Sequence, residues 1–209
     1  MPIVDLTWDF IGERFAPEII RDEIPLKSDK TAYTGIVYKI THDGMSGTYI
    51  DFPGHIAETD NGLYADNCPI ESVYRIPASV IHLQKGNASG AVGAEELQSA
   101  FNGDVPNTPG LIINALGNKF IRDIENRSVY LDNSAVEWII GTGCRFLVSD
   151  IYESPELEGV FLKLFQAGIT TVCMPVNLHL LTEKEVKLSM IFPKIPKVTQ
   201  LPCRLVAEF

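Results

Sequence analysis

Residues 45–55 of the chain read Met45-Ser46-Gly47-Thr48-Tyr49-Ile50-Asp51-Phe52-Pro53-Gly54-His55. The Gly-Thr pair predicts a tight turn, and the residues after it predict an extended segment on which Asp51, Pro53 and His55 alternate. Alternate residues of a strand point to the same face, so we expect Asp51 and His55 to converge on one point. Two residues alone cannot hold a zinc or manganese ion, because such sites need three or more protein ligands.

The composition predicts a soluble protein of one domain that binds neither nucleic acid nor membrane. The chain has 209 residues, of which 45% are hydrophobic and 21% charged, and this is ordinary for a globular domain with a substantial core. Its formal net charge is -10 and it has no run of Lys or Arg, which excludes polyanionic partners. No apolar stretch approaches the ~20 residues of a membrane span.

The N-terminus and the cysteines predict a cytoplasmic location. Residues 1–5 show neither the basic region nor the long apolar region of a signal peptide. The chain has four scattered cysteines, Cys68, Cys144, Cys173 and Cys203, without a Cys-x-x-Cys pair. This distribution indicates reduced thiols in the cytoplasm, not a disulfide framework.

Alternating strand and helix patterns predict an α/β domain. Apolar runs of strand length predict strands at 3–6, 35–40, 78–83, 110–114, 146–149, 169–174, 186–192 and 203–208. Helical signals predict a short helix over 94–101 and a second over 132–140, with Asp132 or Asn133 as its N-cap. Such alternation is typical of parallel strands joined by crossover helices, so we expect one domain with a mixed sheet.

The clearest helix is predicted to begin at Ser154-Pro155, where a capping serine precedes a proline in the first helical position. An apolar stripe follows at helical spacing, and Gly168 ends the helix. The stripe consists of Leu157, Val160, Phe161, Leu164 and Phe165.

Segment 45–55 resembles the H-x-G-T-H-x-D-x-P-x-H signature of the cyclase family, which includes bacterial kynurenine formamidase and isatin hydrolase. The resemblance continues in order along nearly the whole chain, in the segments 3–7, 111–114, 147–150, 168–178, 192–195 and 202–207. It implies a single cyclase-like domain over residues 1–209, with the family's swivelling β/β/α fold.

The resemblance also implies that most of the family's metal ligands are replaced. In the family, two histidines of the signature bind metal together with its aspartate, and these positions hold Met45, Tyr49 and Asp51 here. Only the aspartate matches. The final histidine of the signature acts as general acid or base in the family, and it is matched by His55.

The family's two remaining ligands are a later histidine and a glutamate. By spacing from Gly168 they fall on Phe161 and Cys173, and neither is a match. One ligand of five is retained, so the resemblance implies no cofactor here. A single divalent ion such as zinc or manganese would have to bind through residues outside this alignment, for example Glu153 or His42.

Four residues are candidates for a metal-free catalytic site: His55, Asp51, Tyr49 and Cys173. His55 would be the general base, oriented by Asp51, and Tyr49 would donate a hydrogen bond to a carbonyl. Cys173 would be a nucleophile whose thiol pKa is lowered by His55. The structural alternatives are an Asp51 paired with a backbone N–H, a Tyr49 that fills the lost metal cavity, and a Cys173 packed in the core.

Bulky, mainly apolar side chains in place of imidazoles favour an apolar or aromatic ligand. Met45 and Phe161 would line its pocket, and Asn177 would lie beside it. The resemblance further implies a homo-oligomer, a dimer or tetramer with pockets near the subunit interface. Trp8 or Phe10 would then reach a neighbour's pocket.

These features predict a hydrolase-like protein that acts on a small amide, lactam or cyclic carbonyl compound without the family's usual metal site. The alternative is a catalytically inactive homologue that binds a small aromatic or carbonyl metabolite. A single match among five ligand positions argues against a standard metal-dependent formamidase.

Overall fold

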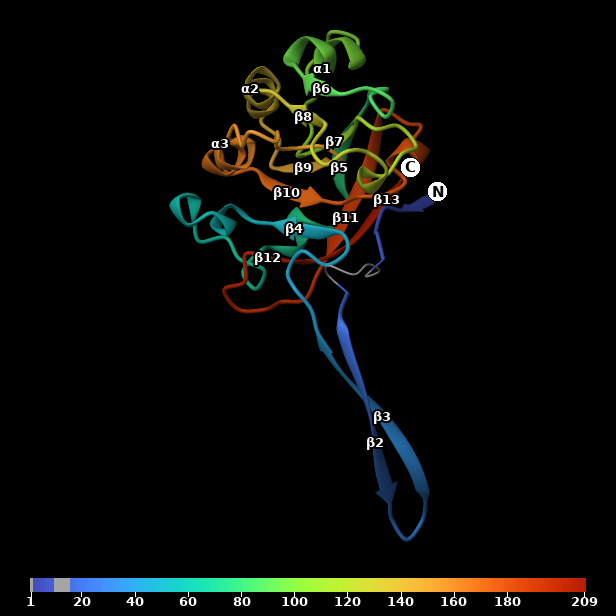
Figure 1. Cartoon of the computed structure of the whole chain (residues 1–209). Helices are drawn as coiled ribbons and strands as arrows, with labels where there is room; N and C mark the ends of the chain where they lie inside the picture. Colours follow the sequence, from blue (N-terminus) through green and yellow to red (C-terminus); the bar gives the residue numbers. More distant parts are fainter. Residues whose placement is uncertain (1, 10–15) are drawn as a thin grey trace.

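A nine-stranded mixed sheet occupies the centre of the molecule (Figure 1). The computed structural model describes residues 2–9 and 16–209. In spatial order the sheet consists of β1 (Ile3–Asp5), β13 (Arg204–Glu208), β11 (Glu185–Ile191), β5 (Ile76–His82), β7 (Gly110–Asn114), β9 (Phe146–Ser149), β10 (Thr170–Cys173), β4 (Tyr49–Asp51) and β12 (Gln200–Pro202). Strands β5, β7, β9 and β10 run parallel, and the remaining pairs are antiparallel. The predicted α/β domain with a mixed sheet is thus confirmed.

Each crossover between the parallel strands contains one α-helix. The helices are α1 (Ala94–Ala100), α2 (Asn133–Gly141) and α3 (Val160–Gln166), and they gather on one side of the sheet (Figure 1). Asp132 caps α2 as predicted, because its side chain accepts a hydrogen bond from the backbone N–H of Ala135 at 2.9 Å.

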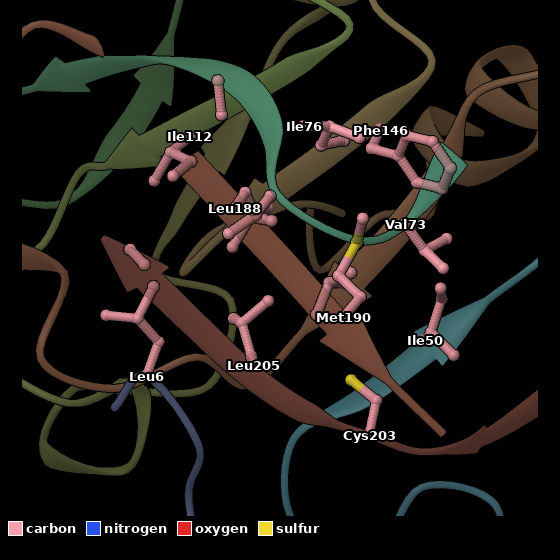
Figure 2. Close-up of a cluster of buried hydrophobic side chains, with 14 of the residues drawn as sticks. Leu6, Ile50, Val73, Ile76, Ile112, Phe146, Leu188, Met190, Cys203 and Leu205 are labelled. Atoms are coloured by element: carbon pink, nitrogen blue, oxygen red, sulfur yellow. The ribbon is translucent and has the colours of Figure 1, made fainter. Parts of the chain in front are cut away.

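Each face of the parallel strands has its own hydrophobic core, because successive residues of a strand point to opposite faces. In β7, Leu111 and Ile113 belong to the core beneath the helices, whereas Ile112 belongs to the core on the other face. Figure 2 shows this second core, to which β11 and β13 contribute Leu188 and Leu205. Strand 110–114 is therefore buried on both faces, as its uninterrupted apolar run predicted.

The helix predicted to begin at residues 154–155 begins at Val160 instead, so this prediction was wrong. Leu157 and Gly159 both have left-handed backbone conformations, with φ of 58° and 82°, which a right-handed helix does not accommodate. The Leu157 side chain is 66% exposed and does not belong to the apolar stripe.

Glu153 supplies the cap that Ser154 was expected to provide. Its Oε2 accepts a hydrogen bond from the backbone N–H of Val160 at 2.9 Å, and its Oε1 accepts one from Ser154 at 3.1 Å. Glu153 is buried, so its carboxylate is engaged at the N-terminus of α3.

A long hairpin extends from the body of the molecule and was only partly predicted (Figure 1). It consists of β2 (Glu18–Lys27) and β3 (Ala32–Thr41), of which sequence analysis predicted 35–40 alone. The pattern of β2 is obscured by Pro25 and by consecutive charged residues, which are depleted in strands. The remaining short elements are β6 (Gly90–Val92), β8 (Val129–Leu131), and the 3-10 helices η1 (Pro53–His55), η2 (Ala57–Thr59), η3 (Ile70–Ser72), η4 (Ile121–Asp123) and η5 (Leu178–Leu180).

Two predictions from composition, on the cysteines and on membrane spans, concern features that the structure describes. All four cysteines are free thiols. None of the helices in the described part of the chain is long and apolar enough to cross a membrane. The cytoplasmic location stays a prediction.

Replacing Gly110 by alanine should lower the free energy of unfolding by about 1–3 kcal/mol, because a new methyl group would overpack the centre of the sheet. A Cβ at this position would lie 2.8 Å from Cβ of Ala78 and 3.3 Å from the carbonyl oxygen of Pro77. The same substitution at Gly141 in α2 meets no described atom within 4 Å. It should leave stability unchanged or raise it by up to about 1 kcal/mol, since alanine is the better helix former. Urea unfolding followed by circular dichroism compares the two variants, and equal midpoints would contradict the prediction.

Candidate functional site

Strand β4 carries the centre of the 45–55 segment and lies between β10 and β12. Its register places Tyr49 directly opposite Cys173 on β10, and Asp51 directly opposite Gln200 on β12. Directly opposed residues of adjacent strands lie on the same face of the sheet, so their side chains are neighbours. The fold thus brings together residues that are far apart in the sequence.

The predicted tight turn before β4 is present. Gly47 has a φ of 66°, and a Cβ on it would lie 2.8 Å from the carbonyl oxygen of Trp8. The hydroxyl of Thr48 accepts a hydrogen bond from the backbone N–H of Trp8 at 2.7 Å and donates one to the carbonyl oxygen of Met174 at 2.8 Å. These bonds fix the start of β4 against β10 and against the N-terminal segment.

Five polar side chains follow one another across this region, and we call them the polar chain: Tyr49, Cys173, Asp51, Gln200 and His55. The hydroxyl of Tyr49 donates to Sγ of Cys173, and this thiol donates to Oδ2 of Asp51 at 3.8 Å. The side chain of Gln200 donates to Asp51, and its Nε2 lies 3.2 Å from Nε2 of His55. The polar chain therefore leads from a largely buried phenol to an exposed imidazole.

Asp51 is the charged centre of the polar chain. The side chain is only 3% exposed, and its Oδ1 has no hydrogen-bond partner among the described residues. Burial raises the pKa of Asp51 to about 6, although the nearby His55 charge and the hydrogen bonds from Gln200 and Cys173 act in the opposite direction. This carboxyl group therefore exchanges its proton close to neutral pH, as a general acid or base does.

Tyr49 and Cys173 both remain protonated at neutral pH. Burial raises the pKa of the Tyr49 phenol well above its ordinary value, and interactions with Cys173 and Asp51 add to this effect. Burial and then the charge of Asp51 likewise raise the pKa of the Cys173 thiol. Both side chains are therefore hydrogen-bond donors in this site, and the thiolate is disfavoured.

The geometry does not favour Cys173 as a nucleophile activated by His55. Among the described residues, the hydrogen-bond partners of the thiol are Asp51, Tyr49 and Thr171. An activating base has to contact the thiol and lower its pKa, and here a neighbouring carboxylate raises it. The nucleophilic role stays an untested prediction.

The backbone that positions His55 differs from the extended segment that the sequence predicted. The segment after Asp51 is not extended, because Pro53–His55 form the 3-10 helix η1 and the backbone N–H of His55 donates to the carbonyl oxygen of Phe52 at 2.8 Å. The predicted alternation was therefore wrong beyond Asp51. Nε2 of the His55 ring lies 3.2 Å from Nε2 of Gln200, and the tautomer of the ring sets which of its two nitrogens carries the proton.

A row of aromatic rings borders the polar chain. Tyr152 stacks on Phe161, with ring centroids 4.9 Å apart, and Phe161 packs against Phe165 at 5.9 Å. Phe165 meets the ring of His55 edge-on at 6.4 Å. Phe161 thus belongs to a row of rings that ends at His55, and rings of this kind suit an aromatic ligand. Its role in ligand binding stays a prediction.

Two of the predicted ligand-binding residues, Met45 and Asn177, are not members of the polar chain. Met45 lies in the turn before β4 and is exposed. Asn177 donates a hydrogen bond to the backbone carbonyl of Asp5 at 3.0 Å and lines a separate cavity of about 160 Å³. Their roles in ligand binding stay predictions.

Trp8 is held within its own chain. Its ring packs edge-on against Phe120 at 4.9 Å, and the guanidinium of Arg122 lies 3.9 Å from the ring centroid. Trp8 also lines a cavity of about 310 Å³. Phe10, the other residue expected to reach a neighbour, lies outside the described residues.

The donor set of the polar chain does not fit a zinc or manganese site. Oδ1 of Asp51 has no hydrogen-bond partner among the described residues, but Cys173 and His55 are not placed with it as a three-ligand group. Within residues 2–9 and 16–209, no group of three or more His, Cys, Asp or Glu side chains is placed to hold a metal ion. Such a site needs at least three protein ligands. The expectation that the protein has no cofactor stays a prediction.

Sequence reasoning missed Gln200 and Tyr152. No motif connects Gln200 with Asp51, and only the register of β4 with β12 makes them neighbours. Gly44 leaves room for this side chain, since a Cβ there would lie 3.0 Å from Oε1 of Gln200. Tyr152 follows the 146–149 strand and joins the core beneath the helices, where nothing in the sequence distinguishes it from other aromatic residues.

Solved structures with the same fold include several hydrolases and cyclases. Isatin hydrolase A from Labrenzia aggregata, bound to benzyl benzoate, has a TM-score of 0.76 and 19% identity, covering 99% of this chain and 93% of that one. A protein described as a potential metal-dependent hydrolase with cyclase activity has a TM-score of 0.69 and 14% identity, covering 99% and 96%. One described as a novel cyclase has a TM-score of 0.73 and 13% identity, covering 100% and 88%. The chain therefore has a cyclase-type, hydrolase-like fold.

The family follows from the sequence. The Cyclase family model matches residues 4–154, which is more than half of the chain and includes segment 45–55. The protein belongs to the Cyclase family, and the resemblance drawn from its motifs is confirmed. No curated protein matches it in sequence.

Proposed function

We propose that the protein hydrolyses a small amide, lactam or cyclic carbonyl compound without the metal site of its family. The observation that carries the proposal is the buried Asp51, whose pKa lies near 6 and whose Oδ1 has no partner among the described residues. A buried carboxylate with one unpartnered oxygen destabilises the folded state, and such groups concentrate at functional sites. Its link through Gln200 to His55 extends this site to an exposed residue.

In the proposed reaction, His55 exchanges a proton with the attacking water and the leaving nitrogen. The water adds its hydroxyl to the carbonyl carbon, the C–N bond breaks, and the nitrogen receives the proton. Asp51 is the positioning residue, because its negative charge acts on the nearby His55 and favours the imidazolium form in the transition state, when the Gln200 side chain presents its amide oxygen to the protonated ring nitrogen. Tyr49 keeps its proton and can donate a hydrogen bond to the developing oxyanion.

A non-catalytic binding role is the second candidate, and the burial of the site favours it. Asp51 is 3% exposed and Cys173 is 4% exposed, so a ligand would first meet the exposed His55 and Phe161, the partly exposed ring of the aromatic row. A protein that only binds an aromatic or carbonyl metabolite needs no exposed carboxylate.

The wild-type chain should open the lactam ring of isatin, or hydrolyse a cyclic imide or an N-formyl arylamine, at a rate that a chelator does not lower. Isatin is a suitable first probe because a protein of the same fold is an isatin hydrolase. The loss of isatin absorbance is followed with and without EDTA, and with added zinc or manganese. Metal content by mass spectrometry serves as the control on each sample.

Turnover that appears only with added metal would contradict the proposal that the protein hydrolyses its substrate without a metal ion. A failure to turn over any of the three compounds, combined with saturable isatin binding by calorimetry, would instead establish the binding role.

A further inference from the structure

Three neighbouring parallel strands end in polar residues that meet at one edge of the sheet. His82 is the last residue of β5, Asn114 is the last residue of β7, and Asp150 directly follows β9. His82 lies directly opposite Asn114, and the backbone N–H of Asp150 donates to the carbonyl oxygen of Ile113 at 3.4 Å. The crevice outside the carboxyl ends of parallel strands is where α/β proteins commonly bind ligands.

Two cavities lie at this edge and adjoin each other. The smaller, of about 160 Å³, is lined by Asp150, and the larger, of about 560 Å³, is lined by His82 and Gln84. Asn114 and Asn118 line both cavities. The polar chain lies on other elements, β10, β4, β12 and η1, so these cavities form a separate candidate site.

Only one end of the Asn114 side-chain amide has a partner among the described residues. Nε2 of His82 lies 2.6 Å from the carbonyl oxygen of Leu181, which can only accept, so Nε2 carries the ring proton. Nδ1 of the neutral ring then accepts a hydrogen bond from Nδ2 of Asn114 at 3.0 Å. Asn114 is only 1% exposed, and its Oδ1 has no partner among the described residues. A ligand that brings a hydrogen-bond donor would satisfy this buried oxygen.

The charge beside Asn114 is negative. Asp150 is buried, and its two carboxylate oxygens accept the backbone N–H groups of Ala115 at 2.8 Å and of Leu116 at 3.0 Å. None of the ion pairs formed by the described residues includes Asp150, although Lys119 lines the smaller cavity. A buried negative charge without a cationic partner attracts a positively charged ligand.

We propose that these cavities bind a small primary amine in its ammonium form. The ammonium group donates an N–H to Oδ1 of Asn114, and its positive charge offsets the negative charge of Asp150. The rest of the ligand extends into the larger cavity, where the side-chain amides of Gln84 and Asn118 can bond to a polar group. The ligand class is therefore a short amine that also carries a hydroxyl or carbonyl group.

An ammonium ion suits the site better than an anion or a metal ion does. An anion would meet the charge of Asp150, and a carboxylate or phosphate ester brings no donor to Oδ1 of Asn114. Zinc or manganese needs three or more protein ligands, and no described group of His, Cys, Asp or Glu side chains is placed to supply them. The ammonium group alone supplies both the positive charge and the N–H donor.

Ethanolamine is the test probe, and choline is its matched comparison. Both are hydroxyethyl cations, but the choline nitrogen carries methyl groups and no N–H. Titration of isotope-labelled wild-type chain with ethanolamine, followed by NMR, should shift the side-chain amide resonance of Asn114 saturably. Choline and potassium chloride at the same ionic strength should leave this resonance in place. The resonance is assigned by its disappearance from the spectrum of Asn114→Leu.

The Asn114→Leu variant should bind ethanolamine at least tenfold more weakly in calorimetry, because leucine has a similar size but no acceptor. Asn107→Leu is the matched control, since this exposed asparagine precedes the opposite end of the same strand, and its affinity should be unchanged. Thermal melts verify that both variants fold.

The absence of a saturable shift with ethanolamine would overturn the proposal, and so would an equal shift with choline or potassium chloride. This comparison uses the wild-type chain and decides the question even if Asn114→Leu fails to fold. It measures binding without isatin, so its outcome is independent of the proposed hydrolysis.

Discussion

The His55→Ala variant should hydrolyse the compound that the wild type hydrolyses with kcat lowered by about 10²–10⁴-fold, the usual contribution of a positioned acid or base. His55 is the exposed end of the polar chain, and it is the member that a substrate and a water molecule can reach. Its ring contacts Gln200 and the edge of Phe165, and alanine removes no buried packing at this position. KM should change little, because the imidazole acts mainly in the transition state.

His179→Ala is the matched control, because this histidine is also exposed but lies in η5, outside the polar chain. Steady-state kinetics of both variants, with thermal melts to verify folding, separate the two functional classes. An unchanged kcat for His55→Ala would show that the proton is carried elsewhere. A large rise in KM with an unchanged kcat would indicate a binding role alone.

The strands and helices of the sheet could be predicted because each has a local cause. The run 111–113 is apolar throughout because both faces of its strand are buried, and Asp132 caps α2 through a bond to a residue three positions away. The hairpin formed by β2 and β3 could not be predicted in the same way. Its apolar residues serve no core within the chain, so β2 shows neither the alternation of a half-buried strand nor an uninterrupted run.

Only the site residues that lie within one sequence segment could be predicted. Tyr49, Asp51 and His55 lie within the 45–55 motif, whereas Gln200 joins them through the pairing of β4 with β12. The start of α3 was misplaced because Ser154-Pro155 is a valid local signal. The buried Glu153 instead accepts the backbone N–H of Val160, seven residues further along, and the helix begins there.

The Asp51→Asn variant should be more stable than the wild type at pH 7.5, by about 2 kcal/mol, and should lose most of its activity. Ordinary aspartate has a pKa of 3.8, and burial raises the pKa of Asp51 to about 6. This difference corresponds to about 3 kcal/mol of folding free energy spent on an ionised carboxylate above pH 6. Asparagine removes the charge, and part of the gain is offset because its amide nitrogen finds no acceptor. In a chain of this size, the melting temperature should rise by roughly 6 °C.

The stability gain of Asp51→Asn should depend on pH, in a direction that follows from the raised pKa of Asp51. Because the folded pKa is higher than the unfolded one, the folded state binds more protons between about pH 4 and 6. The favourable contribution of Asp51 to the free energy of unfolding is therefore fully present below pH 4, and it is lost as the pH rises through 6. The stability gain of Asp51→Asn should shrink as the pH falls from 6 to 4. Urea unfolding at several pH values measures it directly.

Asp150→Asn is the matched control, and it should have the opposite effect. Burial also raises the pKa of Asp150 to about 6, but both its oxygens accept backbone hydrogen bonds, from Ala115 at 2.8 Å and from Leu116 at 3.0 Å. An amide group would turn its own N–H toward one of these donors, so that two buried N–H groups lose their acceptor. At about 1–3 kcal/mol each, this cost outweighs the gain from removing the charge. If Asp51→Asn also destabilised the protein, Asp51 would have a structural role like that of Asp150. Stabilisation with loss of activity, in contrast, would mean that the chain keeps an unfavourable charge for its function.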